Sequence, residues 1–73
     1  MPVVISDHGK RQIKRRNISQ KLILRAVRNP QEIRESFRGR KLRRIHVGGK
    51  LLEIVTRTEG LKITVITAYY LKK

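Results

Sequence analysis

Two histidines and a large excess of arginine are the residues of this chain best suited to chemistry on a phosphodiester. His8 and His46 can act as acid or base because imidazole titrates near neutral pH. Arginines such as Arg44 and Arg57 can hold the negative charge that develops on phosphoryl oxygens. In RNA the 2′-hydroxyl of the substrate attacks the phosphorus, so a protein need only move protons and stabilise charge. These residue types therefore fit metal-independent RNA cleavage.

The two tyrosines near the end of the chain add a further contact for RNA. Tyr69 or Tyr70 can stack on a base or donate a proton. Each candidate also has a simpler interpretation, in which His8 is a polar residue in a first helical turn, His46 is an ordinary strand position and the tyrosines pack in the core. Residue types and spacing alone therefore predict a basic domain that binds RNA or cleaves it.

Charge is the dominant feature of the composition. Lysine and arginine number 19 and aspartate and glutamate 5, which gives a formal net charge of +14 and a pI near 11.6. Such self-repulsion is relieved by a polyanion or by an acidic partner protein. The densest block is 38–44, with five basic residues of seven. The predicted RNA-binding residues are Arg15, Arg38, Arg40, Lys41, Arg43, Arg44, His46, Lys62 and Tyr70.

Other function classes lack the residues they need. Without cysteine there is no disulfide and no cysteine-based zinc site, and the two histidines and five carboxylates are scattered along the chain. We therefore expect no metal and no small-molecule cofactor. A chain of 73 residues predicts one domain, 1–73. No apolar run is long enough for a membrane span or a signal peptide, so a cytoplasmic protein with no membrane partner is expected.

Two helices in the first thirty residues are expected to position His8. The first covers about 7–16, with Ser6 or Asp7 as its N-cap, and the second covers about 20–28 after Ser19. Asn17 suits a left-handed residue between them. The second helix has an apolar face that can cover a sheet.

Strands are expected in the remainder and at the start of the chain. The apolar run ending at residue 5 predicts a leading strand, and 32–37, 42–47, 50–58 and 61–71 have strand composition. A two-residue loop at 48–49 would place Arg44 opposite Glu53. A two-residue loop at 59–60 would place Arg57 opposite Lys62, an unfavourable like-charge pair. The side of the last strand predicted to face the core carries Leu61, Ile63, Val65, Thr67 and Tyr69.

Motifs at both ends of the chain resemble a small prokaryotic family that is treated as a domain of unknown function. Its pattern is His-x-x-x-Arg-hydrophobic-x-x-Arg-Gly-Ile-Ser, a helix, Asn-Pro, and a closing Val-Ile-Thr-x-Tyr. This chain has His8, Ile13, Arg16, Ile18, Ser19, Asn29, Pro30 and the run Val65-Ile-Thr-Ala-Tyr69 at the corresponding positions. It departs at Gln12, where the pattern has Arg, and at Asn17, where it has Gly. The loss of a cation at Gln12 leaves Arg11 or Arg15 as its replacement.

The element order of that family is similar to the RelE-type and BrnT-type toxins of toxin–antitoxin pairs. The resemblance implies an α+β fold, with two N-terminal helices on a three- to four-stranded antiparallel sheet. It also implies a metal-independent endoribonuclease toxin of a type II pair, which cleaves messenger RNA, free or associated with ribosomes, inhibits translation and is controlled by an acidic antitoxin protein. The catalytic set predicted from motif and charge together is His8, Arg16, Arg57, Thr67 and Tyr69. The alternatives are a non-catalytic nucleic-acid-binding module and an interaction domain for an acidic partner.

Overall fold

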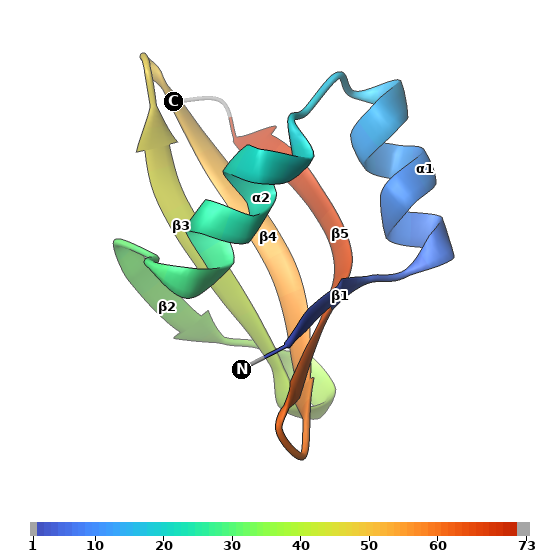
Figure 1. Ribbon diagram of the computed structural model, residues 1–73. Helices are drawn as coiled ribbons and strands as arrows, with labels where there is room; N and C mark the ends of the chain where they lie inside the picture. The colour runs from blue at the N-terminus through green and yellow to red at the C-terminus, as the bar shows by residue number, and fades with distance from the viewer. Residues whose placement is uncertain (1, 72–73) are drawn as a thin grey trace.

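Two helices lie on one face of a five-stranded sheet in the computed structural model of the protein, which describes residues 2–71 (Figure 1). The elements are β1 (Val3–Ile5), α1 (Asp7–Arg15), α2 (Gln20–Arg28), β2 (Glu32–Glu35), the 3-10 turn η1 (Phe37–Gly39), β3 (Arg40–Val47), β4 (Lys50–Glu59) and β5 (Lys62–Leu71). The strand order is β1-β5-β4-β3-β2, with β1 parallel to β5 and every other pair antiparallel.

The predicted α+β class and its two helices are confirmed. The sheet, however, has five strands rather than three or four, and it is mixed rather than purely antiparallel. The difference arises at its two edges. The short β1 pairs in parallel with the N-terminal part of β5, and the four-residue β2 pairs only with β3. The sequence predicts a strand near each edge, but β1 and β2 are too short for their residue pattern to show that they join the sheet.

Local chemistry accounts for the helix boundaries. The Ser6 hydroxyl accepts a hydrogen bond from the backbone N–H of Gly9 at 3.0 Å, which caps α1 as predicted. Asn17 adopts φ 57°, the left-handed conformation expected between the helices. At Gly9 an added Cβ would lie 3.0 Å from the carbonyl oxygens of Val65 and Ile66. Glycine therefore lets α1 approach the backbone of β5 closely.

The core lies between the helices and one face of the sheet. Ile13 of α1 and Ile23 of α2 are buried against strand residues such as Leu52, Ile54 and Val65. The remaining buried apolar residues are Ile18, Ala26, Val27, Ile45, Ile63 and Ala68. We call the other face of the sheet, which neither helix covers, the open face.

The β3–β4 hairpin has the register predicted for a loop at Gly48 and Gly49. Ile45 pairs with Leu52, and Arg44 pairs with Glu53. The predicted side-chain partners on this hairpin are therefore correct.

The predicted register of the β4–β5 hairpin is wrong. The loop residues are Gly60 and Leu61, so Glu59 pairs with Lys62 and Arg57 pairs with Thr64. Gly60 has φ +61° at the first of the two loop positions, which is where a type II′ turn requires glycine, whereas the prediction put it second. The expected pairing of Arg57 with Lys62 does not form.

A bulge in β5 corrects the predicted core side as well. Thr56 pairs with Val65 but Val55 pairs with Thr67, so Ile66 is the extra residue. Each position after the bulge changes face, which places Ala68 in the core and Tyr69 on the open face. Ile63 and Val65 are buried as predicted, but Thr67 and Tyr69 are not core residues, and Leu61 at the loop is 79% exposed.

Candidate functional site

A row of four polar side chains crosses the open face. Glu32, Arg44, Glu53 and Tyr69 are directly paired across β2, β3, β4 and β5. Arg44 Nη1 lies 3.1 Å from Glu32 Oε1, and Arg44 Nε and Nη2 each lie 2.6 Å from Glu53 Oε1. The hydroxyl of Tyr69 donates to Glu53 Oε2. We call this row, together with Arg16, the balanced end of the open face, because it has two carboxylates and two guanidinium groups.

Glu53 is the centre of the balanced end. It is only 3% exposed although it lies on the open face, because Arg44 and Tyr69 flank it on both sides. Burial, followed by the hydrogen bond to Glu53 and the negative charge of its carboxylate, raises the pKa of Tyr69 to about 12. The pKa of Arg44 is raised as well, mainly by its hydrogen bond to Glu53. Near neutral pH the phenol therefore keeps its proton.

Arg16 reaches the balanced end from the helix layer. It is the C-cap residue of α1, and its Nη1 donates to the Ala68 carbonyl at 2.9 Å and to the Thr67 hydroxyl at 3.2 Å. The parallel partner β1 covers β5 only from Ile63 to Val65, so this stretch of the edge is open to a side chain. The structure thus brings together three of the five predicted catalytic residues, Arg16, Thr67 and Tyr69.

His8 belongs to the same side of α1 as Arg16. His8, Gln12 and Arg16 follow one another at four-residue spacing, which keeps them on one helical face beside the buried positions Gly9 and Ile13. His8 itself is exposed in the first turn. It is therefore accessible to a ligand that lies along this face of the helix.

Arg57, the fifth predicted catalytic residue, lies away from this group. It is four residues along β4 from Glu53, or about 13 Å at the usual rise of a strand. There it is directly opposite Arg40 on β3, and Lys62 is opposite Glu59 one pair further along the open face. We call Arg40, Arg57 and Lys62 the cationic end of the open face.

Two of the predicted RNA-binding cations lie on the helix side of the sheet. Arg43 donates from Nε to Thr56 Oγ1 at 3.2 Å and from Nη1 to the Val27 carbonyl at 3.0 Å, in the last turn of α2. The neighbouring Lys41 has the same strand parity and contributes its carbonyl to the Thr56 hydroxyl at 2.9 Å. The block 38–44 is therefore divided between the two faces of β3.

Tyr70 is separated from Tyr69 by the alternation of β5. It pairs with Leu52 on the helix side and packs against the core, and the Lys50 ammonium lies 5.3 Å from the centre of its ring. The two tyrosines therefore cannot contact one ligand on the same face.

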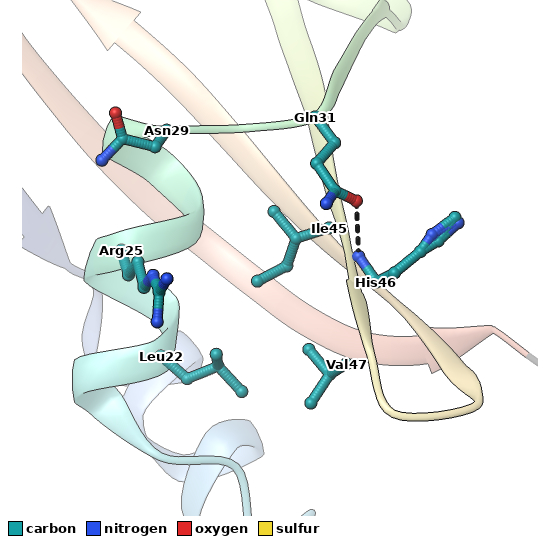
Figure 2. A pocket seen from close by; sticks show the side chains of 7 residues that line it. All are labelled: Leu22, Arg25, Asn29, Gln31, Ile45, His46 and Val47. Atoms are coloured by element: carbon teal, nitrogen blue, oxygen red, sulfur yellow. Dashed lines mark hydrogen bonds between the residues drawn. The ribbon is translucent and has the colours of Figure 1, made fainter.

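His46 borders a pocket of about 330 Å³ between α2 and β3 (Figure 2). Leu22, Ile45 and Val47 supply its apolar wall, whereas the imidazole of His46 points away from α2. The backbone N–H of His46 donates to Gln31 Oε1 at 2.8 Å, so the Gln31 side chain occupies the edge of β3 beyond β2. His46 is thus an exposed open-face residue, two positions along β3 from Arg44.

Most of the cations have no carboxylate partner. Among the 17 lysine and arginine residues at positions 2–71, salt bridges involve two, Arg34 and Arg44. The hydrogen bond from Arg34 is the main cause that lowers the pKa of Glu32. Arg15 and Arg38, both predicted RNA contacts, are exposed.

Two residues of interest were missed by sequence reasoning. Glu53 was paired with Arg44, but its burial was not foreseen because it depends on Tyr69 reaching the open face through the bulge. Phe37 was assigned to a strand, whereas it lies in η1 and is 86% exposed.

Two further observations apply to residues 2–71. No three histidine or acidic side chains in this part of the chain gather as metal ligands would. Neither helix there is long and apolar enough to cross a membrane.

Comparison with known proteins gives a family and no nearer relative. No curated protein and no solved structure matches the chain. The model of one family, described as a domain of unknown function, DUF4258, matches residues 5–70, a range that includes the capped α1, the left-handed Asn17 and the bulged β5. The chain therefore belongs to the DUF4258 family.

Proposed function

We propose that this domain binds RNA through its uncompensated basic surface. The observation that carries the proposal is the near absence of carboxylate partners for the 17 cations described above. Surface cations usually alternate with acids, because a large charge of one sign opposes folding. Binding to a polyphosphate backbone relieves this repulsion and releases counterions, which supplies most of the affinity of a non-specific RNA contact.

The proposal is tested by the salt dependence of RNA binding. The affinity of the purified protein for a labelled single-stranded RNA is measured by fluorescence anisotropy over a series of salt concentrations. The logarithm of the association constant should fall linearly with the logarithm of salt concentration, by about 0.7 per phosphate contacted, which gives a slope of several units. Absence of binding, or binding with little salt dependence, would contradict the proposal.

A second candidate function is that the bound RNA is cleaved without metal by attack of its 2′-hydroxyl. It is favoured by the grouping of Arg16 with Thr67 and Tyr69, which lie about fifty residues further along the chain and carry the family motif at its other end. Arg16 would hold a phosphoryl oxygen, and His8 would transfer protons. The raised pKa of Tyr69 makes it a poor proton donor at neutral pH, so its role would be to orient Glu53 or the substrate.

Cleavage is tested with RNA in the presence of a chelator, with and without ribosomes. The products should carry 2′,3′-cyclic phosphate ends. His8→Ala should lower the rate by about a hundredfold or more, while RNA affinity stays nearly unchanged. His46→Ala tests the other candidate for proton transfer, because His46 is also exposed but lies on β3. Metal dependence or 3′-hydroxyl ends would rule out this mechanism, and full activity of His8→Ala would remove His8 from it.

The toxin assignment would follow from cleavage that inhibits translation together with an acidic partner protein. The informative observation is the neighbouring gene, since a small acidic protein encoded there supports an antitoxin. Co-expression with that protein should suppress both cleavage and RNA binding, because both use the same basic surface. If no such partner exists, RNA binding without a toxin role is the remaining form of the proposal.

A further inference from the structure

Phe37 is the most exposed of the large apolar side chains among residues 2–71. Its exposed fraction is 86%, and Leu61 follows with 79%. A phenylalanine side chain left in water lacks the burial that usually stabilises it in a folded protein. An exposed aromatic ring among basic residues is therefore a contact surface that the fold itself does not use.

The backbone holds Phe37 in a closed loop. Glu35 pairs with Lys41, and the N–H of Ser36 donates to the Arg40 carbonyl at 2.8 Å. Arg38 and Gly39 follow with φ 58° and φ 74°, two left-handed residues in succession. This conformation is uncommon for arginine, so the loop is closed with a local cost in free energy. The ring is consequently presented from a short, constrained loop.

The same loop leads directly into the cationic end. Arg40 begins β3 three residues after Phe37 and is directly opposite Arg57, with no salt bridge to either residue. Directly opposed like charges on adjacent strands are unfavourable. Figure 1 shows η1 and the β4–β5 hairpin at the same end of the sheet. The exposed ring of Phe37 is therefore three residues along the chain from Arg40, and Arg57 is the cross-strand neighbour of Arg40. Among residues 2–71, no salt bridge neutralises either guanidinium group.

We propose that the end of the sheet formed by Phe37, Arg40 and Arg57 is a binding site for single-stranded RNA, where an unpaired base stacks on Phe37 and an adjacent phosphate is held between the two arginines. The proposal rests on the RNA-binding function above and names the form of RNA. Stacking needs a base face that a duplex hides, and it tolerates any base because each has a π-face. One nucleotide would relieve both unfavourable features at once.

An anionic membrane surface would use this end of the molecule differently. Apolar side chains that enter a lipid interface act through buried area, so Leu61 would matter as much as Phe37. Base stacking requires the ring and gains nothing from Leu61. The pair Phe37→Ala and Leu61→Ala is therefore a matched test, since both residues are highly exposed and their truncation leaves the core intact.

The first experiment uses Phe37→Trp in a chain that has no other tryptophan. Its fluorescence is followed during titration with a short single-stranded oligouridylate, a short RNA duplex, inorganic polyphosphate, and vesicles of phosphatidylglycerol. Stacking predicts quenching by the single strand, with little change for the duplex and for polyphosphate. Equal quenching by single strand and polyphosphate would overturn stacking, and a blue shift with vesicles that Leu61→Ala abolishes would assign the surface to a membrane instead.

The second experiment measures affinity. Phe37→Ala should weaken binding of the single strand by at least about fivefold, because a stacked base contributes roughly 1 to 3 kcal/mol, whereas polyphosphate binding should be nearly unchanged. Leu61→Ala should alter neither. If Phe37→Ala binds the single strand as tightly as the wild type, the stacking site is wrong while the RNA-binding function stands. If the wild type binds no RNA, both are wrong.

Discussion

Each end of the open face contains an arginine with a cross-strand neighbour, but the charge of the neighbouring side chains differs between the two ends. At the balanced end Arg44 lies between Glu32 and Glu53, with its side chain 18% exposed, whereas at the cationic end Arg57 faces Arg40. The first arginine stabilises the sheet through its carboxylates, and the second is destabilised by its neighbour. Whether an arginine is available to a ligand thus depends on whether a carboxylate lies beside it.

The largest effect is expected at the centre of the balanced end. Glu53→Ala would leave Arg44 with one exposed carboxylate and the Tyr69 hydroxyl without its acceptor. We expect a loss of about 3 to 5 kcal/mol in the free energy of unfolding, measured by urea titration and circular dichroism. The control is Glu35→Ala, an exposed residue whose loss should change stability by less than about 0.5 kcal/mol. A similar change in the free energy of unfolding for the two variants would show that the polar row does not stabilise the sheet.

A smaller effect at the same end concerns Tyr69 and alkaline pH. Its folded-state pKa of about 12 lies above the usual 10, so folding favours the neutral phenol. The resulting stabilisation is complete below pH 10 and is lost as the pH rises through about 12. Wild type should therefore lose stability across this range more steeply than Tyr69→Phe, while Tyr70→Phe should follow the wild type. Parallel curves for wild type and Tyr69→Phe would contradict the raised pKa of Tyr69, which burial and then the hydrogen bond to Glu53 cause.

The smallest effect is expected at the cationic end. Arg57→Ala removes one member of the like-charge pair with Arg40 and should raise stability by a few tenths of a kcal/mol, up to about 1. High salt should shrink this gain, because it screens exposed charges. A clear loss of stability in the variant would mean that Arg57 has a stabilising partner.

Much of this arrangement is predictable where local chemistry alone decides it. Ser6 caps α1, Asn17 adopts the left-handed conformation, and Gly48-Gly49 sets the register that pairs Arg44 with Glu53. Each of these depends on a few adjacent residues. The choice of Arg16, Thr67 and Tyr69 as catalytic candidates rests on the resemblance of motifs and not on a physical pattern.

The errors begin where a single residue changes the phase of a strand. Gly60 is at the first loop position of the β4–β5 hairpin and not at the second. Ile66 is an extra residue in β5, so Thr67 and Tyr69 lie on the open face and not on the predicted core side. The alternation of apolar and polar residues does change phase at Val65 and Ile66, which are adjacent apolar residues, but two adjacent apolar residues alone do not specify a bulge. The buried network around Glu53 depends on that bulge and could not be predicted.

The most direct test of the account compares arginines of the open face in RNA binding. Arg40 and Arg57 have no salt bridge, whereas Arg34, also exposed, pairs with Glu32 at 3.1 Å. The double variant Arg40→Ala/Arg57→Ala should reduce the salt slope of single-stranded RNA binding by about 0.7, the contribution of the one phosphate held between these arginines, and Arg34→Ala should change it by much less. An unchanged slope in the double variant, or an equal reduction in Arg34→Ala, would contradict the claim that the arginines without a carboxylate partner are the ones that bind RNA.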